Sequence, residues 1–475
     1  MQYNSFLDFL NSPLKNKNSP LQNKNQTDQK QIEEKKIYQS TQELLSSSLA
    51  SDTSIHLDLN YKLIGEQDLT NLSSVFKKCV NLSILKLILN GNNLGDKLIL
   101  FLCNALSNCV NLSNLKLDLF YNNITEQGIS NLSSALVKCS NLQTLNLDIK
   151  SNNIGSQGAQ ILGQMLGQYL QLQTLNLNTS FNYIGPKGAS GLVSTLENCT
   201  NLTEIKLDLF VCSLCEQGAL YLGSALAKIK NLTTLSLGLD QNKIDFKGTQ
   251  DLCSELSKCS NLKYLTLCLF GNNIRDLGIS GLGSALANKT NLSHLKLYLQ
   301  SNFIGAKGLS MFASTLPIQS KLSILELDLS KNDIDFQSLQ DLCSALVKMP
   351  KLQAFILFFE NIFDQGLEEI INESDMESLL CILAKCTQLS TLQMPHQYQY
   401  SIYLINFFIF KREQNHFEFF DLKRQTKNKE NLTDQINKQR FLFQSLFLQF
   451  FKLSYIRRLK KTKVLKMKRL VSIKN

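Results

Sequence analysis

The fold of this chain is decided by a short stretch, LKLDLFYNNI, at residues 115–124. Its leucines alternate with other residues, as in a strand with one buried face. Behind it, apolar residues are spaced three or four apart, as on one face of a helix. These residues are Ile129, Leu132, Ala135, Leu136 and Cys139. The sequence therefore predicts a strand, a turn and a helix between residues 115 and 139.

The same pattern returns every 30 residues along the chain. Two leucine columns run from Leu82 to Leu352 and from Leu87 to Leu357, and a glycine column runs from Gly128 to Gly308. An asparagine column runs from Asn92 to Asn332, interrupted at Cys212. A fixed period of this length is the signature of a solenoid, in which each unit buries its apolar face against its neighbours.

The repeated motif, LxLxLxxNxI, resembles that of leucine-rich repeats, specifically the ribonuclease-inhibitor-like class with a full helix in each repeat. The resemblance covers residues 51–394. It implies an α/β solenoid, a horseshoe with a parallel β-sheet on the concave face and helices on the convex face. Packed helices need about 8–10 Å and neighbouring strands about 4.8 Å, so the helical side is the longer arc. In the family the asparagine is buried and satisfies backbone groups of the turn.

We divide the chain into three parts. Residues 1–37 are rich in Asn, Gln and Lys and are expected to be disordered, residues 38–395 form the solenoid with degenerate end repeats, and residues 396–475 are a basic, aromatic extension. Residues 38–50 are expected to supply a helix that closes the first repeat. Near the other end the asparagine comes one residue early, at Asn361, and residues 372–378 are interpreted as an inserted loop.

The charge of the chain is concentrated at its C-terminal end. The 475 residues are 43% hydrophobic and 19% charged, with a net charge of +10, which excludes a collagen-like or wholly disordered chain. Residues 435–475 hold 12 Lys or Arg and no acid, so the remaining 37 basic residues face 39 acidic ones and give −2. The repeats are electrically balanced, which disfavours nucleic acid as their partner.

Three interpretations of the extension remain open. Its aromatic clusters and basic run could form an amphipathic helix that makes a weak contact with a membrane surface or a calmodulin-like groove, with Phe447, Phe451 and Ile456 as anchors. The basic run could instead bind nucleic acid or act as a nuclear address. The extension could also be an unfolded segment without a binding role.

We expect a cytoplasmic protein, with the nucleus as the alternative. The first ten residues lack the pattern of a secretory signal, and no apolar stretch is long enough to span a membrane. The 13 cysteines are odd in number and fall mostly at repeat positions, which indicates buried, reduced thiols. Triplets such as Asn111-Leu112-Ser113 match a glycosylation acceptor but recur with the repeat, so we interpret them as by-products of repetition.

No catalytic, cofactor or metal site is apparent in the sequence. Its four histidines form no cluster, and neither a phosphate-binding loop nor a kinase motif occurs. Cys212 and Cys215 form an isolated CxxC, which is half a zinc site at most. We interpret this pair as a local variant of the turn, and we expect no small-molecule substrate.

The side chains between the buried leucines should face the concave surface. Aromatic residues exposed on a rigid concavity are typical anchors of protein recognition. Basic and acidic residues also alternate there, and the pairs Lys116–Asp118 and Lys206–Asp208 should partly neutralise one another. The predicted partner-binding residues are Phe120, Tyr121, Phe210, Phe270, Tyr298, Lys116, Asp118, Lys206 and Asp208.

The sequence thus favours a scaffold or adaptor that binds another protein on its concave face and catalyses no reaction. The alternative is a GTPase-activating protein resembling the Ran GTPase activator, which has a similar horseshoe. Activators often supply an arginine to the transferred phosphoryl group. Before residue 412 this chain has one arginine, Arg275, in a turn after a strand.

Overall fold

The computed structural model describes residues 36–47, 51–287, 291–318, 321–359 and 373–393. The chain divides into two compact units, Met1–Ile405 and Asn406–Asn475, and every described residue belongs to the first unit. The predicted extension at 396–475, Asn361, and most of the predicted disordered segment therefore lie outside the described residues. The account below concerns the first unit alone.

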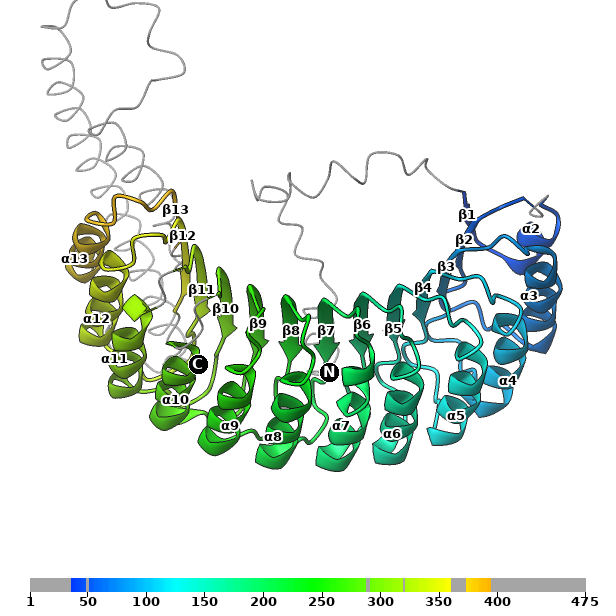
Figure 1. Cartoon of the computed structure of the whole chain (residues 1–475), viewed down its shortest axis with the longest axis horizontal. Coiled ribbons are helices and arrows are strands. Elements are labelled where there is room, and N and C mark those ends of the chain that lie inside the picture. The colour runs from blue at the N-terminus through cyan, green and yellow to red at the C-terminus, as the bar shows by residue number, and fades with distance from the viewer. Residues whose placement is uncertain (1–35, 48–50, 288–290, 319–320, 360–372, 394–475) are drawn as a thin grey trace, which may run out of the picture. The chain divides into compact units, whose positions relative to one another are not determined.

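The described strands form one open sheet of 13 parallel strands in chain order. Neighbouring strands pair with an offset of one repeat, so that Leu85 lies opposite Leu115 and Leu115 opposite Leu145. The sheet lines the inner side of the arc (Figure 1). The strands are β1 (Ile37–Tyr38), β2 (Ser54–Asp58), β3 (Ile84–Ile88), β4 (Asn114–Asp118), β5 (Thr144–Asp148), β6 (Thr174–Asn178), β7 (Glu204–Asp208), β8 (Thr234–Gly238), β9 (Tyr264–Cys268), β10 (His294–Tyr298), β11 (Ile324–Asp328), β12 (Ala354–Phe358) and β13 (Thr391–Gln393).

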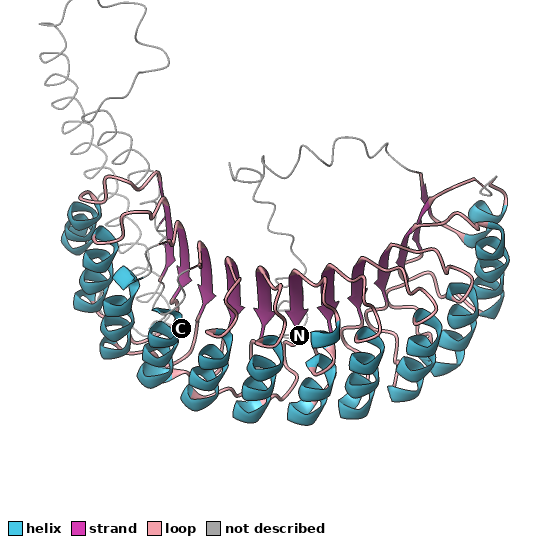
Figure 2. Cartoon of the chain, viewed as in Figure 1, coloured by secondary structure: helices cyan, strands magenta, loops and turns pink. Residues whose placement is uncertain are grey.

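The helices cover the outer side of the arc (Figure 2). One helix follows each strand from β1 to β12 and leads to the next strand, which confirms the predicted α/β solenoid with its sheet on the inner face. The helices are α2 (Thr41–Leu45), α3 (Glu66–Lys78), α4 (Gly95–Leu106), α5 (Glu126–Leu136), α6 (Gly155–Leu166), α7 (Gly185–Val193), α8 (Cys215–Leu226), α9 (Phe246–Leu256), α10 (Arg275–Ala287), α11 (Ala306–Thr315), α12 (Phe336–Val347) and α13 (Glu373–Leu383). Short 3-10 turns follow α7 at Leu196–Asn198 and α11 at Leu316–Ile318.

The core lies between the sheet and the helices. Leu115 and Leu117 of β4 and Ile129 of α5 are fully buried, as the two periodicities predict. The cysteine column belongs to this core: Cys139 is buried, and its thiol donates to the carbonyl oxygen of Cys109 over 3.3 Å. Burial raises the pKa of the Cys139 thiol to about 11. Ten of the 13 cysteines are buried.

A buried asparagine ladder joins the repeats at the C-terminal ends of the strands. The Asn122 Nδ2 donates to the carbonyl oxygen of Leu89 over 2.9 Å, and its Oδ1 accepts from the amides of Asn92 and Leu94 over 3.0 and 3.3 Å. Since each asparagine satisfies backbone groups of the preceding repeat, the column is structural. An unpaired buried amide would cost about 1–3 kcal/mol.

A second polar ladder explains the triplets that match a glycosylation acceptor. The Asn231 Nδ2 donates to the carbonyl oxygen of Thr200 over 2.7 Å, and the Thr233 hydroxyl donates to the carbonyl oxygen of Thr203 over 3.1 Å. Equivalent bonds are made by Asn111, Asn201, Asn261 and Asn291. Both polar members of the triplet therefore bond to the preceding repeat, and the fold alone accounts for their recurrence.

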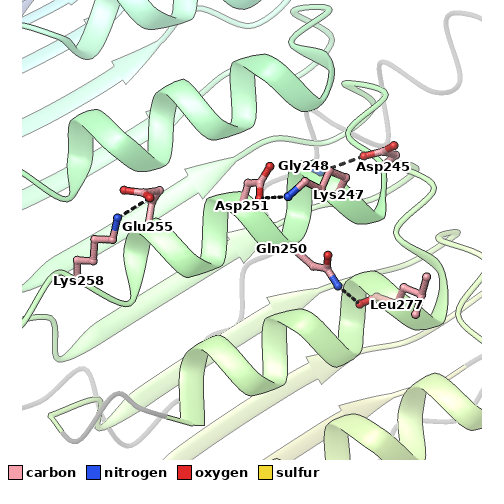
Figure 3. A network of polar contacts seen from close by, with 8 residues as sticks. All are labelled: Asp245, Lys247, Gly248, Gln250, Asp251, Glu255, Lys258 and Leu277. Atoms are coloured by element: carbon pink, nitrogen blue, oxygen red, sulfur yellow. Dashed lines mark hydrogen bonds and ion pairs between the residues drawn. The ribbon is translucent and has the colours of Figure 1, made fainter.

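The outer face of the helices carries polar contacts that are satisfied within the helical layer. Gln250 of α9 donates to the carbonyl oxygen of Leu277 in α10 over 3.0 Å (Figure 3). Within α9, Lys247 pairs with Asp251 at 2.6 Å, and Lys258 pairs with Glu255. Exposed pairs of this kind contribute about 0–1 kcal/mol each.

The N-terminal end of the sheet contains one predicted and one unpredicted element. Helix α2 lies within the expected residues 38–50, and its Thr41 hydroxyl donates to Asp68 of α3 over 2.7 Å. Ser40 caps the helix by accepting from the amide of Glu43. The two-residue strand β1, which pairs with β2, was not predicted, because so short a segment has no measurable periodicity.

The prediction of an inserted loop at 372–378 was wrong for residues 373–378. These residues begin α13, whose Leu379 and Leu383 are buried at helical spacing. The offset between paired strands rises from 30 residues to 37 at this point, since Ala354 lies opposite Thr391. The extra residues therefore precede α13 in the chain, and the polar segment Glu373-Ser374-Asp375 is the first turn of a helix.

Candidate functional site

The inner face of the sheet presents three rows of side chains. Buried apolar residues, most of them leucines, alternate along each strand with residues that are mostly exposed or half-buried, and the constant register aligns the latter across the sheet. The first row contains His56, Lys86, Lys116, Asn146, Asn176, Lys206, Ser236, Thr266, Lys296 and Glu326. The second contains Asp58, Ile88, Asp118, Asp148, Asn178, Asp208, Gly238, Cys268, Tyr298 and Asp328. The third, just after the strands, contains Asn60, Asn90, Phe120, Lys150, Ser180, Phe210, Asp240, Phe270, Gln300 and Ser330.

The carboxylates of the second row accept hydrogen bonds from groups of the turns that follow the strands. Asp208 accepts from the amide of Phe210 over 3.2 Å and from the hydroxyl of Ser180 over 2.8 Å. Asp118 accepts from the amide of Phe120 over 3.4 Å. Both carboxylates thus have a structural task, and the part that they play in binding a partner stays a prediction. Within the described residues, no ion pair joins Lys116 to Asp118 or Lys206 to Asp208.

Burial raises the pKa of several of these carboxyl groups. The pKa of Asp118 rises through burial, against the hydrogen bonds that its carboxylate accepts. The pKa of Asp148 and the pKa of Asp240 both rise to about 6, again mainly through burial, with a further contribution from a neighbouring aspartate. These carboxyl groups on the inner face are therefore poorly solvated.

Tyr298 is held by its neighbours on the inner face. Its hydroxyl donates to Glu326 over 2.6 Å, and Lys296 pairs with the other oxygen of the same carboxylate at 2.8 Å. Glu326 is buried, with 8% of its surface exposed. Burial and the hydrogen bond to Glu326 raise the pKa of Tyr298. This predicted anchor is thus half-buried and already bonded within the protein.

An aromatic strip crosses the edge of the inner face from β4 to β7. We define it by five residues: Phe120, Tyr121, Lys150, Phe181 and Phe210. Phe120 and Tyr121 lie 6.0 Å apart between ring centroids, and Phe181 meets Phe210 edge to face at 4.8 Å. The Lys150 Nζ lies 5.5 Å from the centroid of Phe120 and 5.6 Å from that of Phe181, which joins the two pairs.

The strip contains three of the predicted residues and two that the sequence analysis missed. Phe120 and Phe210 are half-buried, and Tyr121 is 61% exposed. Lys150 and Phe181 were missed, although Lys150 shares the column of Phe120 and Phe181 shares the column of Tyr121. Phe270 follows β9, beyond the β4–β7 extent of the strip, so the structure does not bring it together with the other predicted aromatic residues.

The backbone of the turn that carries the strip is common to the repeats. Tyr121 and Phe181 adopt left-handed conformations, each with φ of 56°, as do Ser151, Val211 and Gln241 at the same position. The strip therefore differs from the other turns in its side chains and not in its backbone.

A family model described as "Leucine Rich repeat" matches residues 111–133 and 138–163, which include β4, α5, β5 and much of α6. The same strand, turn and helix recur along the rest of the described sheet. The described part of the chain therefore folds as a leucine-rich-repeat solenoid. The ribonuclease-inhibitor-like class of leucine-rich repeats stays a prediction.

Two solved structures have some likeness to this leucine-rich repeat protein. A chain from the crystal structure of the Rad7 and Elc1 complex in yeast is 18% identical, with a TM-score of 0.43, over 70% of this chain and 76% of that one. Leiomodin-1 actin-binding site 2 is 14% identical, with a TM-score of 0.27, over 42% of this chain and 97% of that one. No curated protein sequence matches the chain. These likenesses are too weak to carry a functional argument.

The CxxC of this leucine-rich repeat protein is a variant of the asparagine turn. Cys212 is buried, and its thiol donates to the carbonyl oxygen of Thr179 over 3.3 Å. Cys215 is exposed and begins α8 with φ of 56°.

In the part of the chain that the structure describes, no group of three or more His, Cys, Asp or Glu residues is placed to hold a metal ion. Among the same residues, none of the helices is both long and apolar enough to cross a membrane.

Proposed function

We propose that this leucine-rich repeat protein is a scaffold or adaptor that holds another protein against the inner face of its sheet and catalyses no reaction of its own. The observation that carries the proposal is the aromatic strip. Large rings in partly exposed positions are the usual anchors of protein interfaces, because each buries much apolar area at a low cost in conformational entropy.

The exposure of the strip supports the same conclusion. Tyr121 has 61% of its surface exposed, and Phe120, Phe181 and Phe210 are half-buried. Rings that stay partly open to solvent keep apolar area that a partner can bury.

The proposal can be tested by replacing strip residues with residues that the chain itself uses at the same positions. Serine occupies the column of Phe120 and Phe210 at Ser180 and Ser330, and the column of Phe181 at Ser151 and Ser301. We expect Phe120→Ser, Phe181→Ser and Phe210→Ser, made together in the full chain, to leave the far-UV circular dichroism unchanged and to abolish affinity capture of the partner. Tyr221→Ser, on the exposed outer side of α8, is the control.

The alternative function, activation of a GTPase, depends on Arg275. This side chain is exposed at the first position of α10, and the structure shows no ion pair for it among the described residues. Its backbone has φ of 57°. If the purified chain accelerates GTP hydrolysis by a Ran-type GTPase and Arg275→Ala removes that effect, the proposal of a scaffold without catalysis is wrong.

A further inference from the structure

Three basic side chains lie next to one another at the N-terminal end of the inner face. His56, Lys86 and Lys116 occupy the same position of β2, β3 and β4, and the pairing register places each directly opposite the next. Neighbouring strands are about 4.8 Å apart, so the three groups span about 10 Å. We call these three residues the basic row.

The basic row has no acidic partner, in contrast to the lysine at the same strand position of β10. Lys296, at the same strand position in β10, pairs with Glu326 at 2.8 Å. On the outer side, Lys97 pairs with Glu66 and Lys228 with Glu197. Within the described residues, no ion pair involves His56, Lys86 or Lys116.

The nearest acidic groups along the strands accept hydrogen bonds from backbone amides of the turns. Asp58 accepts from the amide of Asn60 over 3.1 Å, and Asp118 accepts from the amide of Phe120 over 3.4 Å. Between them, in β3, the position of the aspartate is taken by buried Ile88. The acidic row is therefore interrupted beside Lys86, the central member of the basic row.

The two lysines of the row repel each other electrostatically. Like charges directly opposite one another on neighbouring strands destabilise a sheet. Burial and then the charge of Lys116 lower the pKa of Lys86, and burial and then the charge of Lys86 lower the pKa of His56. An anionic group bound over the row would relieve this repulsion.

The surroundings indicate which anion fits. Ile84 precedes Lys86 on β3 with 42% of its surface exposed, so an apolar side chain can pack beside the lysines. The aspartates at 58, 118 and 148 border the row, and they would repel the closely spaced phosphates of a nucleic acid. A peptide can present carboxylates to the lysines and neutral residues to the aspartates.

We propose that the basic row binds an acidic segment of the partner protein, with its Asp or Glu side chains against Lys86 and Lys116 and an apolar side chain against Ile84. This inference rests on the proposed function and specifies the chemistry of the partner. The row ends on β4, where the aromatic strip begins at Phe120, so one partner chain can contact both surfaces.

The test uses the full chain and a fluorescein-labelled peptide of alternating glutamate and serine, followed by fluorescence anisotropy. Asn146 and Asn176 occupy the same row in β5 and β6, so Lys86→Asn with Lys116→Asn keeps a residue type that the sheet already accepts. We expect binding by the native chain that weakens with added salt, and about tenfold weaker binding by the double variant. Lys138→Asn, a single exposed lysine just after α5, is the control and should bind normally.

The inference would be overturned by no binding of the peptide by the native chain, by equal binding by the double variant, or by an equal loss in Lys138→Asn. Preference for short duplex DNA over the peptide, lost in the double variant, would assign the row to nucleic acid instead and would also overturn it. Thermal unfolding of each variant shows whether a loss of peptide binding comes from unfolding of the protein. If the strip variants abolish partner capture while the lysine variants bind normally, the proposed function stands and the basic row has no part in it.

Discussion

The thiol of Cys212 donates a hydrogen bond to the carbonyl oxygen of Thr179 over 3.3 Å, in the place where neighbouring repeats use the amide of an asparagine. The backbone amides of Asn182 and Ile184 also face this sulfur. In the preceding repeat the corresponding amides, those of Asn152 and Ile154, bond to the oxygen of Asn182 over 3.2 and 3.3 Å. Sulfur is a weak acceptor, so this joint between repeats is bonded more weakly than the others.

Replacing Cys212 with asparagine should therefore stabilise the protein. Cys212→Asn completes the buried ladder between Asn182 and Asn242, and we expect it to raise the free energy of unfolding by about 1 kcal/mol. Urea denaturation monitored by circular dichroism measures the change. Cys212→Ala, which removes the sulfur without supplying an amide, should be less stable than the native chain. Lower stability of Cys212→Asn would show that the site cannot accept the larger side chain.

The opposite test of the ladder removes one asparagine. Asn272 donates to the carbonyl oxygen of Leu239 over 2.8 Å and accepts from the amides of Asn242 and Ile244 over 2.9 and 3.0 Å. Asn272→Ala leaves these buried groups unpaired and should cost about 3 kcal/mol or more in unfolding free energy. Asn104→Ala, at an exposed position of α4, is the control. A similar loss in both variants would argue against a special role for the ladder.

Tyr169 offers a stabilising substitution in the core. Its side chain is fully buried in the column of cysteines, and in the described structure its hydroxyl has no hydrogen-bond partner. Because an unsatisfied buried hydroxyl costs about 1–3 kcal/mol, Tyr169→Phe should raise the midpoint of thermal unfolding. Differential scanning calorimetry measures it. A decrease would mean that the hydroxyl is bonded to ordered water, and Tyr169→Leu, which leaves a cavity, should be destabilising in either case.

Asp240 should make stability depend on pH. Burial, and to a smaller extent the charge of Asp208, raise the pKa of Asp240 from 3.8 to about 6, so the folded state disfavours the ionised carboxyl group. Its contribution to stability is full below about pH 4 and is lost as the pH rises through 6. Asp240→Asn keeps the oxygen that accepts from the amide of Phe270, as Asn90 does for Phe120.

We expect Asp240→Asn to be more stable than the native chain by about 1–3 kcal/mol near neutral pH, and equally stable below about pH 4. Urea unfolding at a series of pH values gives the difference directly. Asp58→Asn is a suitable control, since its carboxylate also accepts from a backbone amide, that of Asn60. A constant difference at every pH would exclude titration of Asp240 as its cause.

The leucine and asparagine columns were enough to predict the strand, turn and helix of each repeat and the order of the sheet. Both columns consist of buried residues, and the buried positions recur because each repeat has the same backbone geometry. The same logic failed near the C-terminal end. There, the polar residues 372–378 were interpreted as a loop, although Glu373 to Leu383 form α13. In the sequence, polar residues on the exposed side of a helix cannot be distinguished from polar residues in a loop.

The inner face was predicted only in part. Lys150 and Phe181 were missed because contacts between rings and a lysine depend on how the turns of neighbouring repeats face one another, which no single repeat encodes. The structural task of the acidic row did have a signal in the sequence. Asn178 stands in a column of aspartates, and exchange between Asp and Asn indicates an acceptor oxygen in place of a required charge.

The bonds of the buried ladder run from one repeat to the next, and therefore along the arc. Tension applied between the two ends of such a chain of units passes through every joint in series, so its mechanical strength is that of its weakest joint. The substitution of a thiol for an amide at Cys212 places a weak joint near the middle of the sheet, between β6 and β7. Under load we expect the interior repeats to separate there before they separate at a joint made by asparagine.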